Sequence, residues 1–555
     1  MAGVNPSTAL ATVLVRSLAA LGVRHAVLCP GSRSAPLAYA LAEGPLEAHV
    51  RVDERAAGFL ALGLAKASGD PAVVVTTSGT AVANLHPAVL EASHAGVPLL
   101  VLSADRPHDL RGTGANQTTD QVKLFGAAVR SFAEVPAPER RAGQAAAWRA
   151  VAVRAVAAAR GTLTGDPGPV HVNVAFREPL VPDDDASWAE PLEGPVTAVA
   201  GPPPGPPAEV LRAGPRTVVV AGDGAGPAAR ELAAAGGWPL LAEPSSGARA
   251  GANAVGPYRL LLDHAQLGAR VERAVVLGRP TLSRPVSALL ARDGVEVVVV
   301  SPRPAWPDAA GNAARVVAAV AAEPGAGGSG GWLESWRAAG TAAAGAIDGV
   351  LDAEAAAGRV TGPFVAREVA AAGGTLVAGS SNPVRDLDLA AHPGEGAVLA
   401  NRGLAGIDGT LSTASGVALA LGGPVRCLVG DLTFLHDAGG LLVGPGERRP
   451  DLQVVVVDDG GGGIFGLLEH GARASRGAPE AAVFERVFGT PHGAALGPLC
   501  EAYGVGYTAA PDAETLRKVL ASPPPGTSVV HVRIARDTQR DLAFRLRAAA
   551  LDAVG

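Results

Sequence analysis

Acidic residues directly follow two apolar runs in the last third of the chain. Asp431 comes just after the run 425–429, and Asp458 and Asp459 follow the run 453–457. Each run predicts a buried strand, and the segment between them is about long enough for one crossover helix. Since parallel strands end at the same edge of a sheet, where ligands bind, we expect these acids to lie close together.

The residues around these acids favour a metal ion and a phosphate. Gly430 precedes Asp431, the hydroxyl of Thr433 lies two residues further on, and Gly461 belongs to a glycine-rich turn after the second run. Oxygen ligands of this kind suit a hard divalent cation that holds a phosphate. The pattern therefore indicates a cofactor enzyme.

A second chemical pattern lies in the loop 29–37, which connects a predicted strand to a predicted helix. Gly31 permits a tight turn, and Ser32 and Ser34 are able to cap the helix. Arg33 adds a bidentate clamp for a carboxylate. Taken alone, the loop is better explained as a capped turn with a solvated arginine.

Glu54 stands at another predicted strand-to-helix junction, within 52–59. Alone, it indicates an acid placed favourably at the start of a helix. With a cofactor that needs a buried carboxylate, it becomes the best candidate acid.

Arginines recur in or near predicted loops at strand ends. One such arginine is usually solvated, but five together suggest a ligand with several carboxylates. The five are Arg33, Arg106, Arg284, Arg385 and Arg402. The 12 histidines are scattered, and His436, the nearest to the predicted metal loop, is interpreted as structural.

A glycine-rich turn at 222–226 faintly resembles a dinucleotide-binding turn, with Glu243 about 20 residues further on. Its glycine spacing differs from the full fingerprint, and Pro227 begins the following helix early. We interpret it as a plain strand–helix turn. A nucleotide-binding oxidoreductase is the alternative function of a different class.

The length and the pattern of apolar runs predict the fold that positions these residues. The chain has 555 residues, which favours three domains, and the Pro- and Gly-rich segments 200–216 and 322–331 predict linkers between them. Unalternated Val- and Leu-rich runs separated by Ala-rich stretches predict parallel strands covered by helices on both faces. The fold class is thus α/β, with three doubly wound domains and mostly parallel sheets.

Composition narrows the function classes. The net charge is −6 without a basic block, which disfavours nucleic acid as a partner. Three widely separated cysteines argue against a zinc site and a disulfide framework. No apolar run approaches membrane-spanning length, and the first residues do not resemble a signal peptide, so we expect a cytoplasmic protein.

Over its whole length the chain resembles the thiamine-diphosphate-dependent enzymes. The segments that carry the resemblance are 29–37, 53–66, 112–117, 401–409 and 430–437. Within that family it is most similar to the branch that makes 2-succinyl-5-enolpyruvyl-6-hydroxy-3-cyclohexene-1-carboxylate in menaquinone biosynthesis. The resemblance implies a pyrimidine-binding domain at 1–190, a central domain at 200–325 and a diphosphate- and metal-binding domain at 345–555.

The resemblance also implies roles for single residues. Glu54 matches the catalytic glutamate that bonds to the pyrimidine ring, and Asp431 matches a ligand of Mg²⁺, with Mn²⁺ as the alternative metal. Asp459 replaces the family's metal-binding asparagine, the Gly461 carbonyl is the third protein ligand, and Asp458 is the alternative register for Asp459. The residues matching other cofactor-contacting positions are Ser32, Gly430, Thr433, Arg402, Ile407 and Ile464. Those matching substrate-contacting positions are Arg33, Arg106, Asn116, Gln117, Arg284, Ser381, Arg385 and Phe465.

The implied reaction joins 2-oxoglutarate to isochorismate with loss of CO₂, which makes the chain a transferase. A homodimer or homotetramer with active sites at the subunit interface is implied as well. Another decarboxylating ligase of the family, similar to acetolactate synthase, is the alternative. It needs fewer carboxylate clamps, so the five arginines count against it.

Overall fold

The computed structural model describes residues 5–182, 191–201, 205, 208–323 and 331–555. The chain folds into two compact units. Unit 1 is made of Met1–Pro204, Gly403–Gly423 and Asp437–Asp451, and unit 2 of Gly205–Arg402, Pro424–His436 and Leu452–Gly555. The linkers predicted at 200–216 and 322–331 lie partly outside the described residues.

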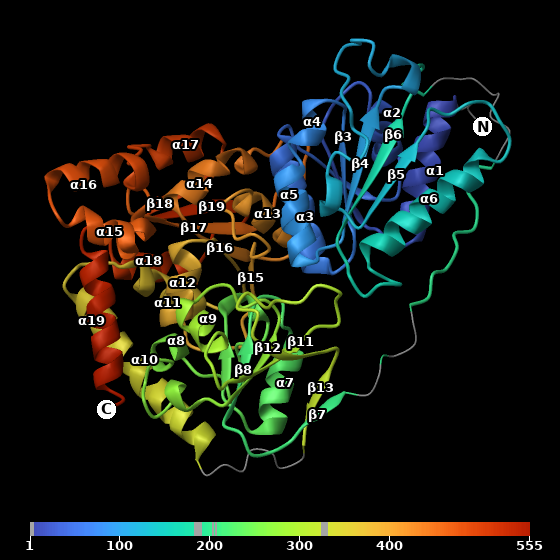
Figure 1. Cartoon of the computed structure of the whole chain (residues 1–555). Coiled ribbons are helices and arrows are strands. Elements are labelled where there is room, and N and C mark those ends of the chain that lie inside the picture. Colours follow the sequence, from blue (N-terminus) through green and yellow to red (C-terminus); the bar gives the residue numbers. More distant parts are fainter. Residues whose placement is uncertain (1–4, 183–190, 202–204, 206–207, 324–330) are drawn as a thin grey trace. The chain divides into compact units, whose positions relative to one another are not determined.

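The described residues of unit 1 form a six-stranded parallel sheet (Figure 1). In spatial order its strands are β2 (Glu47–Val50), β1 (His25–Leu28), β3 (Ala72–Thr76), β4 (Leu99–Asp105), β6 (Pro169–Ala175) and β5 (Ser131–Val135). All residues of β1, β3, β4 and β6 are buried, as expected for strands covered on both faces.

Helices cover both faces of this sheet (Figure 1). The helices of unit 1 are α1 (Pro6–Ala20), α2 (Ala35–Ala42), α3 (Glu54–Ser68), α4 (Thr80–Ala83), α5 (His86–Ala95), α6 (Gln144–Ala159) and α13 (Thr410–Leu421). One core cluster joins α1, α2 and α6 to the sheet, and another joins α3 and α5 to the opposite face.

Helices α3 and α13 pack so closely that their backbones are in contact at two glycines. A Cβ added to Gly63 would lie 2.1 Å from the carbonyl oxygen of Thr413, and one added to Gly416 would lie 2.2 Å from that of Leu60. Only glycine permits so close an approach, because any side chain would overlap the opposite backbone. The small residues of α3 are therefore explained by a neighbouring helix from the last third of the chain.

The described residues of unit 2 contain two larger parallel sheets and a two-stranded one. The five-stranded sheet has the order β12 (Ala313–Val317), β11 (Glu296–Val300), β10 (Arg273–Leu277), β8 (Thr217–Ala221) and β9 (Leu240–Ala242). The six-stranded sheet has the order β15 (Val398–Ala400), β14 (Thr375–Ala378), β16 (Val425–Gly430), β17 (Leu452–Asp458), β19 (Thr527–Arg533) and β18 (Gly506–Ala509). The short pair is β13 (Val320–Ala322) with β7 (Glu209–Leu211).

Helices alternate with these strands. The helices of unit 2 are α7 (Pro227–Gly236), α8 (Tyr258–Leu261), α9 (Arg284–Leu290), α10 (Trp332–Ala356), α11 (Gly362–Ala371), α12 (Asn382–Ala390), α14 (Asp431–His436), α15 (Glu469–Ala474), α16 (Ala478–Phe484), α17 (Leu496–Ala502), α18 (Ala513–Ala521) and α19 (Gln539–Asp552). Parallel sheets with alternating helices confirm the predicted α/β class. The three domain boundaries stay a prediction.

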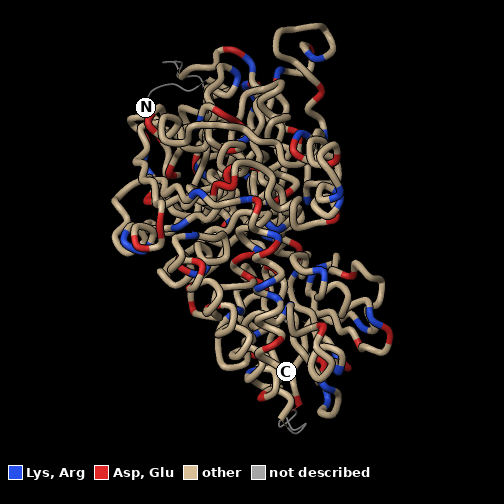
Figure 2. The backbone as a smooth tube through the Cα atoms, turned by 90° about the vertical axis from the view of Figure 1, so that its left-hand side faces the viewer, with Lys and Arg blue, Asp and Glu red and all other residues tan. Residues whose placement is uncertain are grey.

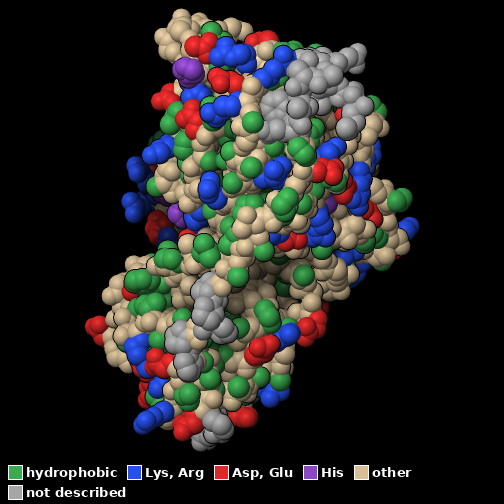
Figure 3. Space-filling model, turned by 90° about the vertical axis from the view of Figure 1, so that its right-hand side faces the viewer, with side chains coloured by type: hydrophobic (Ala, Val, Ile, Leu, Met, Phe, Trp, Pro, Cys, Tyr) green, Lys and Arg blue, Asp and Glu red, His purple; other side chains and the backbone are tan. Residues whose placement is uncertain are grey.

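Lys and Arg residues are interspersed with Asp and Glu residues along the chain (Figure 2). The face drawn in Figure 3 also carries charged side chains of both signs. In the part of the chain that the structure describes, no helix combines the length and the apolar character needed to cross a membrane.

Candidate functional site

Four strand exits of unit 1 meet at the carboxyl edge of its sheet. Because β1, β2, β3 and β4 are parallel neighbours in space, the residues after them share one edge. The exits are the loop after Leu28, the segment leading to Glu54, the turn after Thr76, and Arg106, which directly follows β4. A Cβ on Gly31 would lie 2.3 Å from Cβ of Thr77, so Gly31 is required by this close packing.

Arg33 and Arg106 bring two positive charges to this edge. Arg106 is 9% exposed, and its Nη1 donates to Ser78 Oγ and, at 3.1 Å, to the carbonyl oxygen of Gln117. Burial, followed by the charge of Arg33, lowers the pKa of the Arg106 guanidinium. Two guanidiniums within electrostatic reach of each other suit an anionic ligand.

Each of the two arginines is fixed by neighbouring groups. Arg33 Nη1 donates to the Phe176 carbonyl oxygen at 2.9 Å, and Arg33 Nη2 lies 2.9 Å from Glu178 Oε1. The backbone N–H of Arg106 donates to Asp105 Oδ1 at 2.7 Å. These contacts limit the conformational freedom of the Arg33 side chain and of the Arg106 backbone.

A buried polar network lies directly behind Arg106. Asp105 is fully buried, and its Oδ2 accepts from Asn173 Nδ2 at 2.8 Å. Ser103 Oγ donates to Asn173 Oδ1 at 2.8 Å and lies 2.7 Å from Nε2 of the buried His171. Because buried polar groups with several partners have little freedom, the network fixes the end of β4 and the backbone of Arg106.

Glu54 is the first residue of α3, as predicted. Asp53 caps this helix, since its Oδ1 accepts from the Ala56 N–H at 3.1 Å. Glu54 is half-buried, and its charge, after burial, contributes to raising the pKa of the Cys29 thiol. Glu54 and the exit of β1 therefore lie at the same edge.

The remaining predicted residues of unit 1 surround this edge or lie near it. Ser32 is exposed, and neither Ser32 nor Ser34 makes the expected cap: Ser34 Oγ donates instead to the Gly31 carbonyl oxygen at 3.0 Å. Asn116 and Gln117 are exposed. Gln117 Nε2 donates to the Ser78 carbonyl oxygen at 3.0 Å, which ties the predicted polar loop to the β3 exit.

In unit 2, the acids of the last third meet as predicted. Strands β16 and β17 are parallel neighbours, so Asp431 and Asp458 stand at one edge. The carboxylate oxygens of these two residues and one nitrogen of His492 lie within 4.8 Å of one another. Asp431 Oδ2 accepts from the Gly461 N–H at 2.7 Å and lies 3.0 Å from His492 Nε2.

The two carboxyls have different environments. Burial raises the pKa of Asp431 to about 6. The pKa of Asp458 lies well below its usual range: burial opposes this shift, but His531, 2.7 Å away, and the Gly460 N–H both stabilise the charged form.

Asp459 points elsewhere. Its Oδ2 accepts from Gln539 Nε2 at 3.0 Å, whereas its Oδ1 is buried without a hydrogen bond. Asp459 also lines a cavity of about 460 Å³ together with Arg536 and Phe484. The register of the second metal ligand, Asp459 or Asp458, stays a prediction, although Asp458 is the acid that lies beside Asp431.

The donor set at this edge fits a hard divalent ion. Carboxylate oxygens of Asp431 and Asp458 lie within 4.8 Å of each other and of one His492 nitrogen. Mg²⁺ prefers oxygen ligands of this kind. Gly461, in the turn after Asp459, leaves no room for a side chain. A Cβ there would lie 2.0 Å from the Gly489 carbonyl oxygen.

A second pair of arginines lies in unit 2. Arg402 is 4% exposed, and its Nη2 donates to Thr281 Oγ1 at 3.0 Å. Burial, then the charges of Arg402 and Arg259, lower the pKa of Arg385, whose Nη1 donates to the Ser381 carbonyl oxygen at 2.9 Å. Arg385 belongs to helix α12 and not to a loop.

Glu243 lies within electrostatic reach of Arg402. It is 2% exposed, and its Oε1 accepts from the Leu282 N–H at 2.9 Å, whereas its Oε2 has no hydrogen bond. Burial raises its pKa to about 8, although Arg402 acts in the opposite direction. The glycine-rich turn 222–226 packs directly against the protein backbone. A Cβ on Gly222 would lie 2.0 Å from the backbone nitrogen of Pro280. Helix α7 begins at Pro227, as predicted.

Arg284 and Phe465 lie on more open parts of unit 2. The Arg284 side chain is 76% exposed, and its Nη1 is 2.7 Å from Glu469 Oε1. The Phe465 ring packs against Phe488, with centroids 5.5 Å apart. The other predicted residues lie near strand ends: Gly430 ends β16, Thr433 is buried in α14, Ile464 is in the 3-10 helix Gly463–Leu467 after β17, and Ile407 is in the segment before α13.

Several residues of these sites escaped the sequence interpretation. His492 and His531 contact the acids from 61 and 73 residues away along the chain. Only His531 leaves a signal, as a polar residue within the apolar run of β19. Arg259 was also not predicted.

Comparison with known proteins identifies the family. Residues 8–124 match the family model of the thiamine pyrophosphate enzyme, N-terminal TPP binding domain. A 2-succinyl-5-enolpyruvyl-6-hydroxy-3-cyclohexene-1-carboxylate synthase of Kineococcus radiotolerans is 57% identical, over 99% of this chain and 100% of that protein. Proteins of the same name from Renibacterium salmoninarum (51% identical, 97% and 96% covered) and Paenarthrobacter aurescens (50% identical, 99% and 98% covered) are similar as well. The chain therefore belongs to the 2-succinyl-5-enolpyruvyl-6-hydroxy-3-cyclohexene-1-carboxylate synthases, a family of thiamine-diphosphate-dependent enzymes.

Proposed function

We propose that this chain joins 2-oxoglutarate to isochorismate with loss of CO₂, giving 2-succinyl-5-enolpyruvyl-6-hydroxy-3-cyclohexene-1-carboxylate for menaquinone biosynthesis. The proposal is supported by relatives of that name that match nearly the whole chain. The structural observation that carries it is the meeting of Asp431 and Asp458 at neighbouring strand ends, beside a glycine-rich turn. Such an edge suits a metal ion that holds a diphosphate.

Thiamine diphosphate, when bound, supplies a thiazolium carbon that adds to the 2-oxo group and takes up the electrons released with CO₂. Glu54 is proposed to hold a proton shared with the pyrimidine ring. Its position at the start of α3, beside the exit of β1, fixes its backbone for that role. Ser32 is proposed to contact the cofactor from the same edge.

The metal ion is proposed to be Mg²⁺, with Mn²⁺ as the alternative. Asp431, Asp459 and the Gly461 carbonyl are its proposed protein ligands, and Asp458 replaces Asp459 in the alternative register. The contact between Asp431 and Asp458 supports the alternative, whereas the oxygen of Asp459 without a hydrogen bond supports the first assignment. Gly430 and Thr433 are proposed to contact the diphosphate.

Carboxylate binding is proposed for the arginines. Arg33 and Arg106 form one pair of cations and Arg385 with Arg402 another, and close cations favour a ligand that carries several carboxylates. Arg284 is proposed to add a further cation, and Arg402 also to contact the cofactor. Hydrogen bonds to the substrates are proposed for Asn116, Gln117 and Ser381, while Ile407, Ile464 and Phe465 are proposed to exclude water.

A homodimer or homotetramer is proposed, with each active site built from Glu54 of one subunit and Asp431 of another. Mixing inactive Glu54→Gln and Asp431→Asn proteins under conditions that exchange subunits tests this arrangement. Activity returns if hybrid dimers contain one site with both native residues. Mixtures that stay inactive after confirmed exchange refute the shared site.

The reaction itself is tested by turnover of the purified chain with 2-oxoglutarate, isochorismate, thiamine diphosphate and Mg²⁺. Loss of isochorismate absorbance and mass spectrometry of the product report the reaction. Pyruvate replaces 2-oxoglutarate as the control donor. Preference for pyruvate would replace the proposed substrate by that of an enzyme similar to acetolactate synthase.

A further inference from the structure

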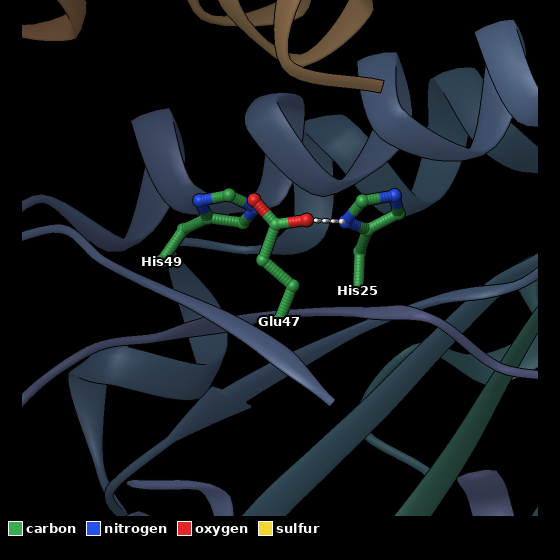
Figure 4. Close-up of side chains that lie close together, drawn as sticks. All are labelled: His25, Glu47 and His49. Atoms are coloured by element: carbon green, nitrogen blue, oxygen red, sulfur yellow. Dashed lines mark ion pairs between the residues drawn. The ribbon is translucent and has the colours of Figure 1, made fainter. Parts of the chain in front are cut away.

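A second cluster of metal-binding side chains lies in unit 1. His25, Glu47 and His49 each offer one ligand atom, and these atoms lie within 4.8 Å of one another. The three side chains point toward one another from β1 and β2 (Figure 4). None of these residues is used by the proposed reaction.

Strand geometry brings the three side chains to one face. β1 and β2 are parallel, and His25 pairs directly with Glu47. His49 follows Glu47 by two residues, so both side chains point to the same side of the sheet. Because His25 and Glu47 are the first residues of their strands, the cluster begins near the opposite edge from Glu54 and Arg106.

The two imidazoles are buried with ring nitrogens that make no hydrogen bond. His25 is 9% exposed and His49 is 1% exposed. His25 Nδ1 and His49 Nε2 have no hydrogen-bond partner, and both are directed at the Glu47 carboxylate. Leaving a buried polar atom without a hydrogen bond destabilises the fold, so two such atoms facing one carboxylate indicate a ligand between them.

The distance between His25 and Glu47 is that between two ligands of a tetrahedral metal ion, and all three ligand atoms lie within 4.8 Å of one another. His25 Nδ1 lies 3.4 Å from Glu47 Oε2, and His49 Nε2 lies 3.8 Å from Glu47 Oε1. Donors bound to Zn²⁺ at about 2.0–2.1 Å in tetrahedral geometry are about 3.4 Å apart. The cluster therefore needs only small side-chain shifts to accept an ion.

The surroundings support neutral imidazoles and an oriented carboxylate. Burial lowers the pKa of both histidines, that of His49 to about 4, so the rings are neutral at pH 7 and able to bind a metal. Arg448 Nη1 donates to Glu47 Oε1 at 2.8 Å and orients the carboxylate. Arg24, Arg51 and Arg448 also bring positive charge near the rings. This charge weakens binding relative to a closed structural zinc site.

We propose that His25, Glu47 and His49 form a binding site for a divalent transition-metal ion of the Zn²⁺ type, with water as the fourth ligand. The bound ion links β2, an edge strand of four residues, to β1. Glu47 Oε2 binds the ion while Arg448 holds Oε1. The site is separate from the proposed Mg²⁺ site and does not depend on the proposed reaction.

Titration of the full-length protein with Co²⁺, a spectroscopic substitute for Zn²⁺, tests this proposal. The protein is first treated with chelator and then loaded with Mg²⁺ and thiamine diphosphate, so that the cofactor site is occupied. We expect visible ligand-field bands that saturate at about one ion per chain and disappear when Zn²⁺ displaces Co²⁺. Hydrogen exchange in β2 should slow when Zn²⁺ is bound.

Three variants assign the ion to the cluster. Glu47→Gln, His25→Gln and His49→Gln should each weaken Co²⁺ binding roughly tenfold or more. Glu47→Gln is the variant least prone to misfold, because the Glu47 side chain is 41% exposed. His264→Gln, which removes a half-buried histidine of unit 2, and Asp431→Asn, which removes the proposed Mg²⁺ ligand, should leave Co²⁺ binding unchanged.

Two results would overturn the proposal. One is the absence of saturable Co²⁺ bands in the native protein. The other is native affinity in a folded Glu47→Gln variant. Loss of binding in Asp431→Asn with retention in Glu47→Gln would place the ion at the cofactor site instead.

Discussion

The two six-stranded sheets share one topology but differ in which charged groups lie at their carboxyl edges. Their strand orders, β2-β1-β3-β4-β6-β5 and β15-β14-β16-β17-β19-β18, are the same when each sheet is numbered from its own first strand. The first edge holds Arg33 and Arg106, and the other holds Asp431 and Asp458. Topology thus fixes where a site is built, while a few side chains after the strands fix which ligand it takes.

The supporting residues differ in the same way. Behind Arg106, Asp105 and Asn173 form a buried polar network that holds a cation in place. Beside the acids, His492 and His531 contact Asp431 and Asp458. At each edge, polar side chains therefore hold the charged residues in place. The charged groups themselves remain available to contact a ligand.

Metal removal should have the largest effect, because it takes away the proposed ligand of the acidic edge. Treatment with EDTA followed by dialysis should abolish turnover, and Mg²⁺ together with thiamine diphosphate should restore it. Asp431→Asn should not be rescued by ordinary Mg²⁺ concentrations. Full recovery without added metal or cofactor would show that the acids have another role.

Glu54→Gln should have the second-largest effect on turnover. It changes only the carboxyl edge of the unit 1 sheet, where Arg33 and Arg106 also lie. Loss of the proton-holding carboxylate should lower kcat by about 10²–10⁴-fold, while circular dichroism and thermal midpoint stay native. Asp53→Asn, which keeps the helix cap, is the matched control. Native turnover in Glu54→Gln would end the assignment of Glu54.

The two registers of the second metal ligand are separated by comparing Asp459→Asn with Asp458→Asn. Loss of a metal ligand should weaken metal-dependent activation by roughly tenfold or more, and the other substitution should change it little. A Mg²⁺ titration of turnover measures the effect. Equal weakening by both substitutions would mean that neither register alone describes the site.

Arg106→Lys tests whether the basic edge clamps a carboxylate. Lysine keeps the charge but loses the two-pronged hydrogen bonding, so KM for one substrate should rise by about tenfold to a hundredfold. The exposed Arg177, paired with Asp109, supplies the control Arg177→Lys. An unchanged KM for both substrates would assign Arg106 a structural role.

The smallest effect is expected at the exposed Arg284–Glu469 pair of unit 2. Since exposed ion pairs contribute little, Glu469→Gln should leave the thermal midpoint unchanged within error. If Arg284 binds a substrate carboxylate, the same substitution should lower KM slightly, because it frees the guanidinium. A large drop in thermal midpoint would show that the pair is structural.

Much of this arrangement could be predicted from sequence because strand ends are local features. The runs 425–429 and 453–457 do form β16 and β17, and Glu54 does begin a helix. The direction of the Asp458 and Asp459 side chains could not be predicted, because it depends on the residue at which β17 ends. Contacts such as that of His492 with Asp431 depend on tertiary folding, which no local pattern records.

The contact of α3 with α13 has a practical consequence for dividing the protein. Unit 1 is not a contiguous fragment, because α13 is encoded some 350 positions after Gly63 and is separated from the first 204 residues by most of unit 2. An expressed fragment that stops near residue 200 would expose the buried face of α3 to solvent and should aggregate. A split or circularly permuted version must keep α13, whose Gly416 fits directly against the backbone of α3.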